Sequence, residues 1–270
     1  GSTRQTAGLP AIDVTSICDA ALKLTKEFGI DGWSIRQLAK EINAYPGVIN
    51  YHVGRREDVV HLVIEHVNAE IDLPEPRENW KRWFKLLLEG MRSTLRKYPG
   101  VARRLAAVGP GLGESDRIIN CGIQVLRDAG FGDWSTLVYS VLLCQTCAFV
   151  ATEDDRDKMD DVRKEVGGSY ASALSASDPG IAALAKTVKL LTEEESLRRS
   201  FFDHQFSVLL DALLGDTCRT TEGYDYIVGI LHLLGFISNL RFTNLPVFLL
   251  KGNIALLHDL RLEFQRGHDV

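Results

Sequence analysis

The sequence predicts an all-α protein, and three observations support this prediction. Apolar residues recur at helical spacing through most of the chain, helix-capping and helix-stopping residues flank these stretches, and no convincing series of alternating strands appears. The chain has 270 residues, of which 45% are hydrophobic and 25% charged, as is normal for a globular protein with a sizeable core. Because this length allows two domains, we expect a small N-terminal helical domain followed by a larger one.

The first predicted helices are short and well delimited. Residues 13–28 carry one apolar face, where Asp13 can cap the start and Gly29 can end the helix. Ser34 and Gln37 then have the spacing of a capping box, which starts the next helix. Pro46 suits the first position of a third helix. These signals predict further helices at about 35–42, 46–52 and 56–72.

A junction is predicted after these helices. The stretch "DLPEPRENW" (72–80) contains two prolines, which are typical of a connection between domains. We therefore place the first domain at 11–72 and the second at 73–215. The opening "GST" and the rest of 1–10 are interpreted as a tag remnant and N-terminal arm. Residues 216–270 are expected to form a C-terminal helical extension of unknown role.

Longer helices are expected in the second domain. The charge run at 153–165 is typical of a solvated face, and the small, polar stretch 167–180 predicts a mobile connection. Thr192 is a candidate cap for the last helix, whose first turn is rich in glutamate. The predicted helices lie at about 78–97, 101–108, 114–129, 134–152, 181–190 and 193–214.

The stretch "INYHVGRRED" (49–58) suggests a DNA-binding motif. Two short helices separated by a tight turn make a helix-turn-helix, whose second helix can enter the major groove while its neighbours contact phosphates. Asn50 can bond adenine in two places and Val48 can meet a thymine methyl group. A plain corner between two helices is the alternative interpretation. The candidate DNA contacts are Ser34, Arg36, Tyr45, Gly47, Val48, Asn50, Tyr51, His52 and Arg56.

Charge alone does not predict DNA binding. The formal net charge of the chain is −5, and its first 66 residues contain seven Lys and Arg against eight Asp and Glu. Any phosphate contacts must therefore come from cations placed locally, as at Arg4, Arg36, Arg55 and Arg56.

Residues 11–66, centred on "SIRQLAKEINAYPGVINYHVGRREDVV", resemble the DNA-binding domain of TetR-family transcriptional regulators. His52 matches the His of the family pattern, and Arg56 occupies the position of its Lys. The resemblance implies that Arg56 contacts a phosphate near a helix N-terminus. Asn50 replaces a Tyr that commonly contacts DNA in the family, so Tyr51 beside it is the candidate for that contact. The operator sequences of family members therefore do not predict the operator of this chain.

The resemblance continues more weakly over about 78–215, which is similar to the effector-binding and dimerisation domain of the tetracycline-repressor-like branch. It implies a homodimer that binds a double-stranded, pseudo-palindromic operator as a repressor and is released by a small, largely apolar organic effector. Helices at 134–152 and 193–214 would pack against their symmetry mates. The matching pocket positions are Leu87, Met91, Ile119, Gly122, Leu137, Ser140 and Cys144, for which core packing is an equal alternative. The candidate interface residues are Leu197, Phe201, Val208, Leu209 and Leu213.

No cofactor or metal is expected. Tetracycline-type repressors bind their drug as a magnesium chelate through a His, a Thr and a Glu. Here Ala106 and Gly109 occupy the first two places, and only Glu153 remains. A hard divalent cation needs several oxygen or nitrogen ligands, so the resemblance and this departure together predict a metal-independent effector.

Other motifs favour structural roles. "CQTC" (144–147) is compatible with redox or metal sensing, but it lies in an apolar helix, where core packing is the better interpretation. "GPGLGES" (109–115) lacks the strand and the Lys of a phosphate loop. No zinc-binding spacing and no acid–base or nucleophilic constellation is visible, so we do not expect an enzyme. A regulator that senses through Cys144 and Cys147, and a helical interaction module without an operator, remain the alternatives.

Cysteine usage and hydropathy bear on the compartment. Five cysteines, an odd number, in a chain with no secretion signal favour a reducing cytoplasm. The apolar stretch 226–240 is shorter than the roughly 20 residues that span a bilayer. We therefore expect a cytoplasmic protein with no membrane partner.

Overall fold

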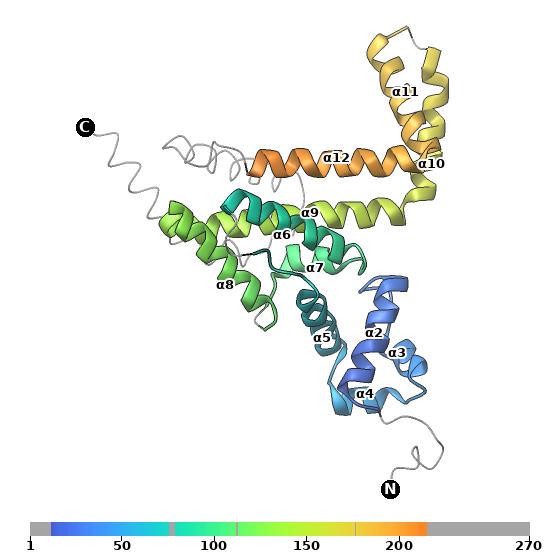
Figure 1. Ribbon diagram of the computed structural model, residues 1–270. Coiled ribbons are helices and arrows are strands. Elements are labelled where there is room, and N and C mark those ends of the chain that lie inside the picture. The colour runs from blue at the N-terminus through green and yellow to red at the C-terminus, as the bar shows by residue number, and fades with distance from the viewer. Residues whose placement is uncertain (1–11, 76–78, 112, 176, 215–270) are drawn as a thin grey trace, which may run out of the picture.

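The computed structural model describes residues 12–75, 79–111, 113–175 and 177–214, and all regular structure in these ranges is helical (Figure 1). The predicted all-α fold is confirmed. The predictions for the arm at 1–10, the helix stop at Gly215, the apolar stretch 226–240 and the extension 216–270 lie outside these residues. The division into domains at 72 and 215 stays a prediction.

The first helices, α2 (Val14–Phe28), α3 (Ile35–Glu41) and α4 (Pro46–His52), begin where the sequence predicts. Asp13 caps α2 by accepting a hydrogen bond from the backbone N–H of Ser16, and Gly29 follows its end with a φ of 78°. Ser34 and Gln37 form the predicted capping box of α3. Helix α5 (Arg56–Ala69) ends three residues earlier than the predicted residue 72.

A single buried core fixes the orientation of α4. Ile17 of α2, Leu38 of α3 and Ile49 of α4 are fully buried and belong to the same cluster. The indole of Trp33 donates from Nε1 to Oγ1 of Thr25 at 2.9 Å, and that hydroxyl donates to the carbonyl of Ala21. These contacts hold the loop before α3 against α2, so α4 is presented on a rigid base.

The second part of the chain is built around the long helix α9 (Ser135–Lys158), against which α6 (Trp80–Leu95), α7 (Val101–Val108) and α8 (Ser115–Leu126) pack (Figure 1). Helix α12 (Glu195–Leu213) runs alongside α9, where the rings of Phe149 and Phe206 lie 5.1 Å apart.

Helix α9 extends beyond the predicted end at 152, and the expected solvated face begins with two buried acids. Glu153 and Asp154 are 4% and 3% exposed. Arg92 donates from Nε and Nη2 to the two oxygens of Glu153, at 2.9 and 2.7 Å, and Arg96 pairs with Asp154. Because buried carboxylates require such partners, these pairs explain why the helix continues into a charged sequence.

Two further expectations are wrong in detail. The stretch 167–180 contains the end of α10 (Asp160–Ser169), the 3₁₀ segment η3 (Tyr170–Ser175) and the start of α11 (Pro179–Glu193) instead of a mobile connection. Thr192 lies inside α11, where its hydroxyl donates to the carbonyl of Val188, so it does not cap the last helix.

The chain also bends between α8 and α9. The predicted helix 114–129 ends as an α-helix at Leu126 and passes into η1 (Arg127–Phe131) and η2 (Gly132–Trp134), with Gly130 at a φ of 92°. By length and composition, Ser115–Lys158 is one apolar helical stretch long enough to cross a membrane, and half of its most apolar window is buried. The backbone turns at Gly130, and α8 packs back on α9, so the stretch is not a straight span.

Candidate nucleic-acid interface and effector cavity

Helix α4 places aromatic and polar side chains on the surface of the first domain. Tyr45 and Tyr51 are 83% and 86% exposed, whereas Ile49 on the other side of the helix is fully buried. Aromatic side chains are enriched where proteins contact partners, so two exposed rings on one short helix indicate a binding surface.

The remaining candidates of this helix share that surface to different degrees. Gly47 and Asn50 are exposed, Val48 is partly buried, and a Cβ atom at Gly47 would meet no heavy atom within 4 Å. The ring of His52 is exposed and meets the edge of the Tyr51 ring, with centroids 5.2 Å apart. The structure thus brings the candidates of α4 together on one open face.

Two candidates come from helix α3. Ser34 and Arg36 are both exposed at its beginning. The Ser34 hydroxyl is held in the capping box with Gln37. Arg36 has a solvent-accessible charge on α3, the helix that precedes α4, and the phosphate contact expected there from the sequence stays a prediction.

Arg56 has extensive contacts within its own domain. Its Nη2 donates to the carbonyl of Ile30 at 2.6 Å and its Nε to the carbonyl of Trp33 at 3.2 Å. Its guanidinium also lies over the Trp33 ring, 4.8 Å from the centroid, and only 27% of the side chain is exposed. These contacts position the loop before α3. Arg55, the preceding residue, is the exposed cation at the start of α5.

Helix α7 is joined to the first domain by one arginine. Arg104 donates from Nη2 to Asp31 and from Nη1 to Glu57, both at 2.7 Å. The hydrogen bond from Arg104 holds the pKa of Glu57 below its usual value. The backbone N–H of Ile30 also donates to the carbonyl of Pro99, just before α7. A movement of α7 would therefore displace the loop before α3, and with it α3 and α4.

A second arginine, Arg117 of α8, holds the C-terminal end of α5. Its Nη2 donates to the carbonyls of Asn68, Ala69 and Ile71. A cation at these carbonyls is favourable because the C-terminus of a helix carries a partial negative charge. Helix α5 is thus fixed to α8 at its C-terminal end, and it also contacts α2 and the loop before α3.

Between α5, α7, α8 and α9 lies a cavity of about 230 Å³. This volume lies just below the usual range of small-molecule pockets, roughly 300–1,000 Å³, and suits a compact ligand. Its walls are mostly apolar, and no Lys, Arg or His is among the described residues that line them. The main apolar contributors are Ile71, Met91, Leu105, Ile118, Ile119, Ile123 and Leu143.

The cavity includes four of the predicted effector positions, namely Met91, Ile119, Ser140 and Cys144. Three others do not line it. Leu87 is fully buried in the core, and Leu137 is also buried. Gly122 lies behind the ring of Tyr139, since a Cβ at this glycine would stand 2.6 Å from Cε2 of that ring. Ala106 and Gly109 do line the cavity. They occupy the positions expected for the His and the Thr that bind magnesium in tetracycline-type repressors.

The sequence did not single out Asn68 or Tyr139, which line the cavity and are 3% and 6% exposed. A signal for Asn68 was available. Asn68 continues the four-residue spacing of Val60 and Ile64, so a polar residue appears where the apolar face of the helix predicts an apolar one.

The two cysteines of the "CQTC" motif are poorly suited to sensing. Burial raises the pKa of both thiols, that of Cys147 to about 12. Thiols react with oxidants and bind metals as thiolates, so a raised pKa lowers their reactivity at neutral pH. No group of three or more His, Cys, Asp or Glu that could hold a metal occurs in the described ranges.

The candidate interface residues of α12 fall into two groups. Leu197, Phe201 and Val208 are 42%, 39% and 52% exposed and share one face of the helix. Leu213 is buried at 6% exposure, and Leu209 is partly buried against the same core. The exposed face is thus available to a second copy, whereas Leu213 packs within its own chain.

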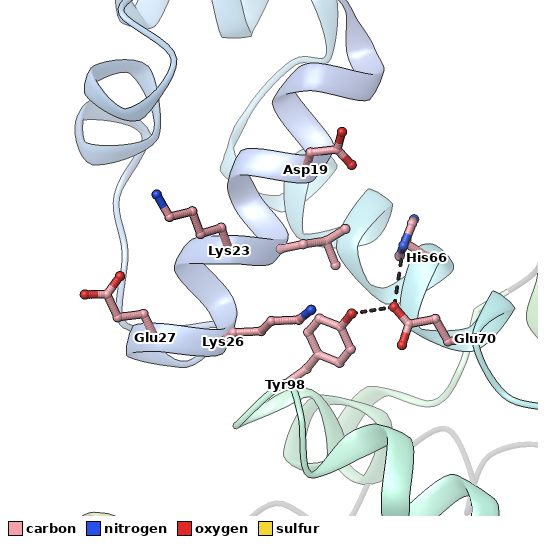
Figure 2. A pocket seen from close by; sticks show the side chains of 8 residues that line it. Asp19, Lys23, Lys26, Glu27, His66, Glu70 and Tyr98 are labelled. Atoms are coloured by element: carbon pink, nitrogen blue, oxygen red, sulfur yellow. Dashed lines mark hydrogen bonds and ion pairs between the residues drawn. The ribbon is translucent and has the colours of Figure 1, made fainter.

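An open groove of about 560 Å³ lies where α2, α5 and the turn before α7 meet (Figure 2). Glu70 accepts a hydrogen bond from the Tyr98 hydroxyl and lies 3.6 Å from Nε2 of His66, while Lys26 stands over the Tyr98 ring. Lys23, which also lines the groove, pairs with Glu41 outside it. The hydrogen bond between Tyr98 and Glu70 adds a further link between α5 and the turn before α7.

The comparisons with known proteins agree with this geometry, although no protein-family model matches the chain. An HTH-type transcriptional regulator from Saccharopolyspora erythraea is 28% identical over 131 residues, which cover 48% of this chain and 55% of the relative. The class D tetracycline repressor protein from Escherichia coli is 24% identical over 119 residues, covering 43% and 54%. The chain spans about half the length of these curated relatives.

Solved structures match over more of the chain. ActR, a TetR-family protein of Streptomyces coelicolor solved in complex with actinorhodin, superposes with a TM-score of 0.60 at 21% identity, over 76% of this chain and 95% of ActR. The recognition made from the sequence is confirmed: this chain has the fold of the TetR-family transcriptional regulators, and in sequence it is similar to members of that family.

Proposed function

We propose that the protein is a ligand-responsive transcriptional regulator, by default a repressor, that binds a pseudo-palindromic DNA operator as a homodimer. The observation that carries this proposal is the surface of α4, which exposes Tyr45, Gly47, Asn50 and Tyr51 on a helix anchored by the buried Ile49. The similarity to proteins named transcriptional regulator and repressor supports it.

The contacts with DNA follow from the position of each side chain. Gly47, Val48 and Asn50 face the bases, with Asn50 reading adenine and Val48 a thymine methyl group. Tyr45, Tyr51 and His52 contact the flanking backbone. Ser34, Arg36 and Arg56 extend this surface, and Arg55 adds an exposed cation beside it.

The homodimer is proposed from the exposed apolar face of α12, formed by Leu197, Phe201 and Val208. In a two-fold dimer this patch contacts the same patch of the second subunit, so both apolar patches become buried. Such a dimer presents two copies of α4, which must lie about one DNA turn apart, roughly 34–36 Å, to read both half-sites.

The effector is proposed to occupy the cavity between α5, α7, α8 and α9. It needs no metal ion, since Glu153 is already held by Nε and Nη2 of Arg92 and does not line this space. Occupation shifts α7, which Arg104 ties to the first domain, and α5, which belongs to that domain. The two reading helices then lose their spacing, and operator affinity falls.

A selection of random DNA duplexes with the full chain tests the proposal. We expect enrichment of a palindrome whose half-sites are separated by about one turn. Recovery of no enriched sequence would overturn the proposed function. Effector candidates are then added with and without EDTA, and release is expected to be the same in both. A requirement for magnesium would overturn the metal-independent part.

The same proposal makes the protein a regulator rather than an enzyme, without a cofactor and acting in the cytoplasm. A regulator that senses through Cys144 and Cys147 is less well supported, because the raised pKa of both buried thiols works against oxidation and metal binding.

A further inference from the structure

Two side chains that line the apolar cavity each carry a buried polar group without a hydrogen-bond partner among the residues that the structure describes. The groups are Nδ2 of Asn68 and the hydroxyl of Tyr139, whose residues are more than nine-tenths buried. Leaving a buried donor unpaired costs free energy, and native proteins avoid it. Two such groups on one cavity point to a ligand that completes them.

The two serine hydroxyls that line the cavity do not share this property. The Ser115 hydroxyl donates to the carbonyl of Gly111 and that of Ser140 to the carbonyl of Thr136, both at 2.8 Å. Both serine hydroxyls therefore have partners four residues earlier in the chain. The unmet hydrogen-bonding capacity belongs to one residue of α5 and one residue of α9.

The ring of Tyr139 is held in place. It packs edge-on against Phe84, with centroids 6.5 Å apart, and Gly122 leaves room for its edge. Burial raises the pKa of Tyr139, so its hydroxyl keeps its proton and remains a donor at neutral pH. A fixed donor of this kind selects ligands by the position of an acceptor.

We propose that Asn68 and Tyr139 are the hydrogen-bond anchors of the effector, and that the effector is a neutral, largely apolar compound that carries a carbonyl oxygen. The inference rests on the proposed function of this cavity. A carbonyl oxygen has two lone pairs, so it accepts hydrogen bonds from both groups or from either. A carboxylate fits poorly, since no cation lines the described walls to offset its burial.

The two anchors have different roles. Asn68 belongs to α5, where its own carbonyl accepts a hydrogen bond from Arg117 at 2.8 Å. A ligand bound to its side chain therefore acts on the helix that reaches the first domain. Tyr139 belongs to α9, the centre of the second domain. Asn68 transmits the signal, whereas Tyr139 only holds the ligand.

Matched pairs of probes test the chemistry. Fluorenone is compared with fluorene, and tetralone with tetralin, by calorimetric titration of the full chain. Each carbonyl compound is expected to bind about tenfold more tightly than its hydrocarbon, the effect of one buried hydrogen bond. This difference should become smaller in Asn68→Leu and in Tyr139→Phe, because each variant removes one of the two donors. Asn68→Ala replaces the first variant if Asn68→Leu does not fold.

Thr146→Val is the matched control. Thr146 is fully buried and its hydroxyl also lacks a partner among the described residues, but it does not line the cavity. This variant should keep the difference between carbonyl compound and hydrocarbon. Equal binding of the members of each pair, or no binding of either, would overturn the proposal, as would an unchanged preference in both cavity variants.

Operator release separates the inference from the proposed function. With the selected operator, saturating fluorenone should release DNA from the unaltered chain and from Tyr139→Phe, but not from Asn68→Leu. Failure to find any operator contradicts the proposed function, while the titrations still decide whether the cavity selects carbonyl compounds. Full release from Asn68→Leu would contradict the transmitting role of Asn68.

Discussion

Arg104 and Glu57 form a hydrogen-bonded ion pair between α7 and the start of α5, with Nη1 of the arginine 2.7 Å from Oε2 of the glutamate. The same guanidinium holds Asp31 in the loop before α3. Leu105 and Ala106, the next residues of α7, line the cavity. One short helix therefore contacts both the ligand space and the first domain.

Arg104→Gln should uncouple ligand binding from DNA release. The variant loses two ion pairs, each worth about 0.2–1 kcal/mol of stability if largely solvated, so the fold should persist. Operator binding without ligand is expected to remain, while saturating ligand should release less DNA, as measured by fluorescence anisotropy. Arg103→Gln is the control, because Arg103 on the same helix pairs with the exposed Asp155. Equal release in the two variants would contradict the coupling role.

Gly47→Ala should weaken operator binding without weakening the fold. No atom of the protein lies within 4 Å of the added methyl group, and alanine favours a helix over glycine by about 0.5–1 kcal/mol. Stability measured by thermal unfolding should rise or stay level, whereas operator affinity should fall because the methyl group meets DNA. Gly90→Ala in α6 has the same open surroundings and should leave affinity unchanged. Unaltered operator affinity in Gly47→Ala would mean that DNA does not closely approach Gly47.

Arg55→Ala and Arg56→Ala should have different consequences. Loss of the exposed Arg55 is expected to weaken binding to all sequences alike and to reduce the salt slope by about one unit. Arg56→Ala should lower the free energy of unfolding by about 1–3 kcal/mol, since two hydrogen bonds to the carbonyls of Ile30 and Trp33 are lost. Titrations at several salt concentrations and urea unfolding measure the two effects. A stable Arg56→Ala with a reduced salt slope would assign this arginine directly to a phosphate.

Val208→Arg should produce folded monomers. The side chain is 52% exposed in the single chain, so a charge there harms only the proposed interface. Sedimentation at micromolar concentration should show a dimer for the unaltered chain and a monomer for this variant. Val162→Arg, at a residue of α10 that is 57% exposed, is the control and should remain dimeric. Leu213→Arg is expected to unfold the protein instead, since Leu213 is buried.

Thiol labelling should distinguish structural from sensing cysteines. Cys121 is exposed and is expected to react first with iodoacetamide, whereas Cys147 should react only on unfolding. Because burial raises the pKa of the partly buried Cys144, its labelling in the folded protein should be slow at neutral pH and faster as pH rises. Mass spectrometry of the labelled peptides measures this order. Rapid labelling of Cys144 at neutral pH would favour a redox sensor.

The N-terminal helices could be predicted because their signals are local. Asp13, the Ser34–Gln37 capping box and Pro46 each act within one helical turn, and all three start helices in the structure. The contacts of Arg56 could not be predicted, since its partners Ile30 and Trp33 lie 26 and 23 residues away.

The same reason explains the errors in the second domain. The charged end of α9 is helical because Arg92 and Arg96, about 60 residues earlier, neutralise Glu153 and Asp154. Their pairing depends on how α6 packs against α9, which the spacing of residues does not reveal. The candidate cavity was found in part, because family-like spacing gave four of its residues but not the unpaired groups of Asn68 and Tyr139.

The hydrogen bonds of Arg117 to the end of α5 make this helix a lever. Because three carbonyls bond one guanidinium, α5 resists sliding along its own axis. The helix can still tilt about this C-terminal end. The helix has 14 residues and is therefore about 21 Å long. A rotation of about 5° at the Arg117 end carries the other end through an arc of about 2 Å. A ligand that moves Asn68 by a fraction of an ångström can thus displace a reading helix by a distance that matters to a base pair.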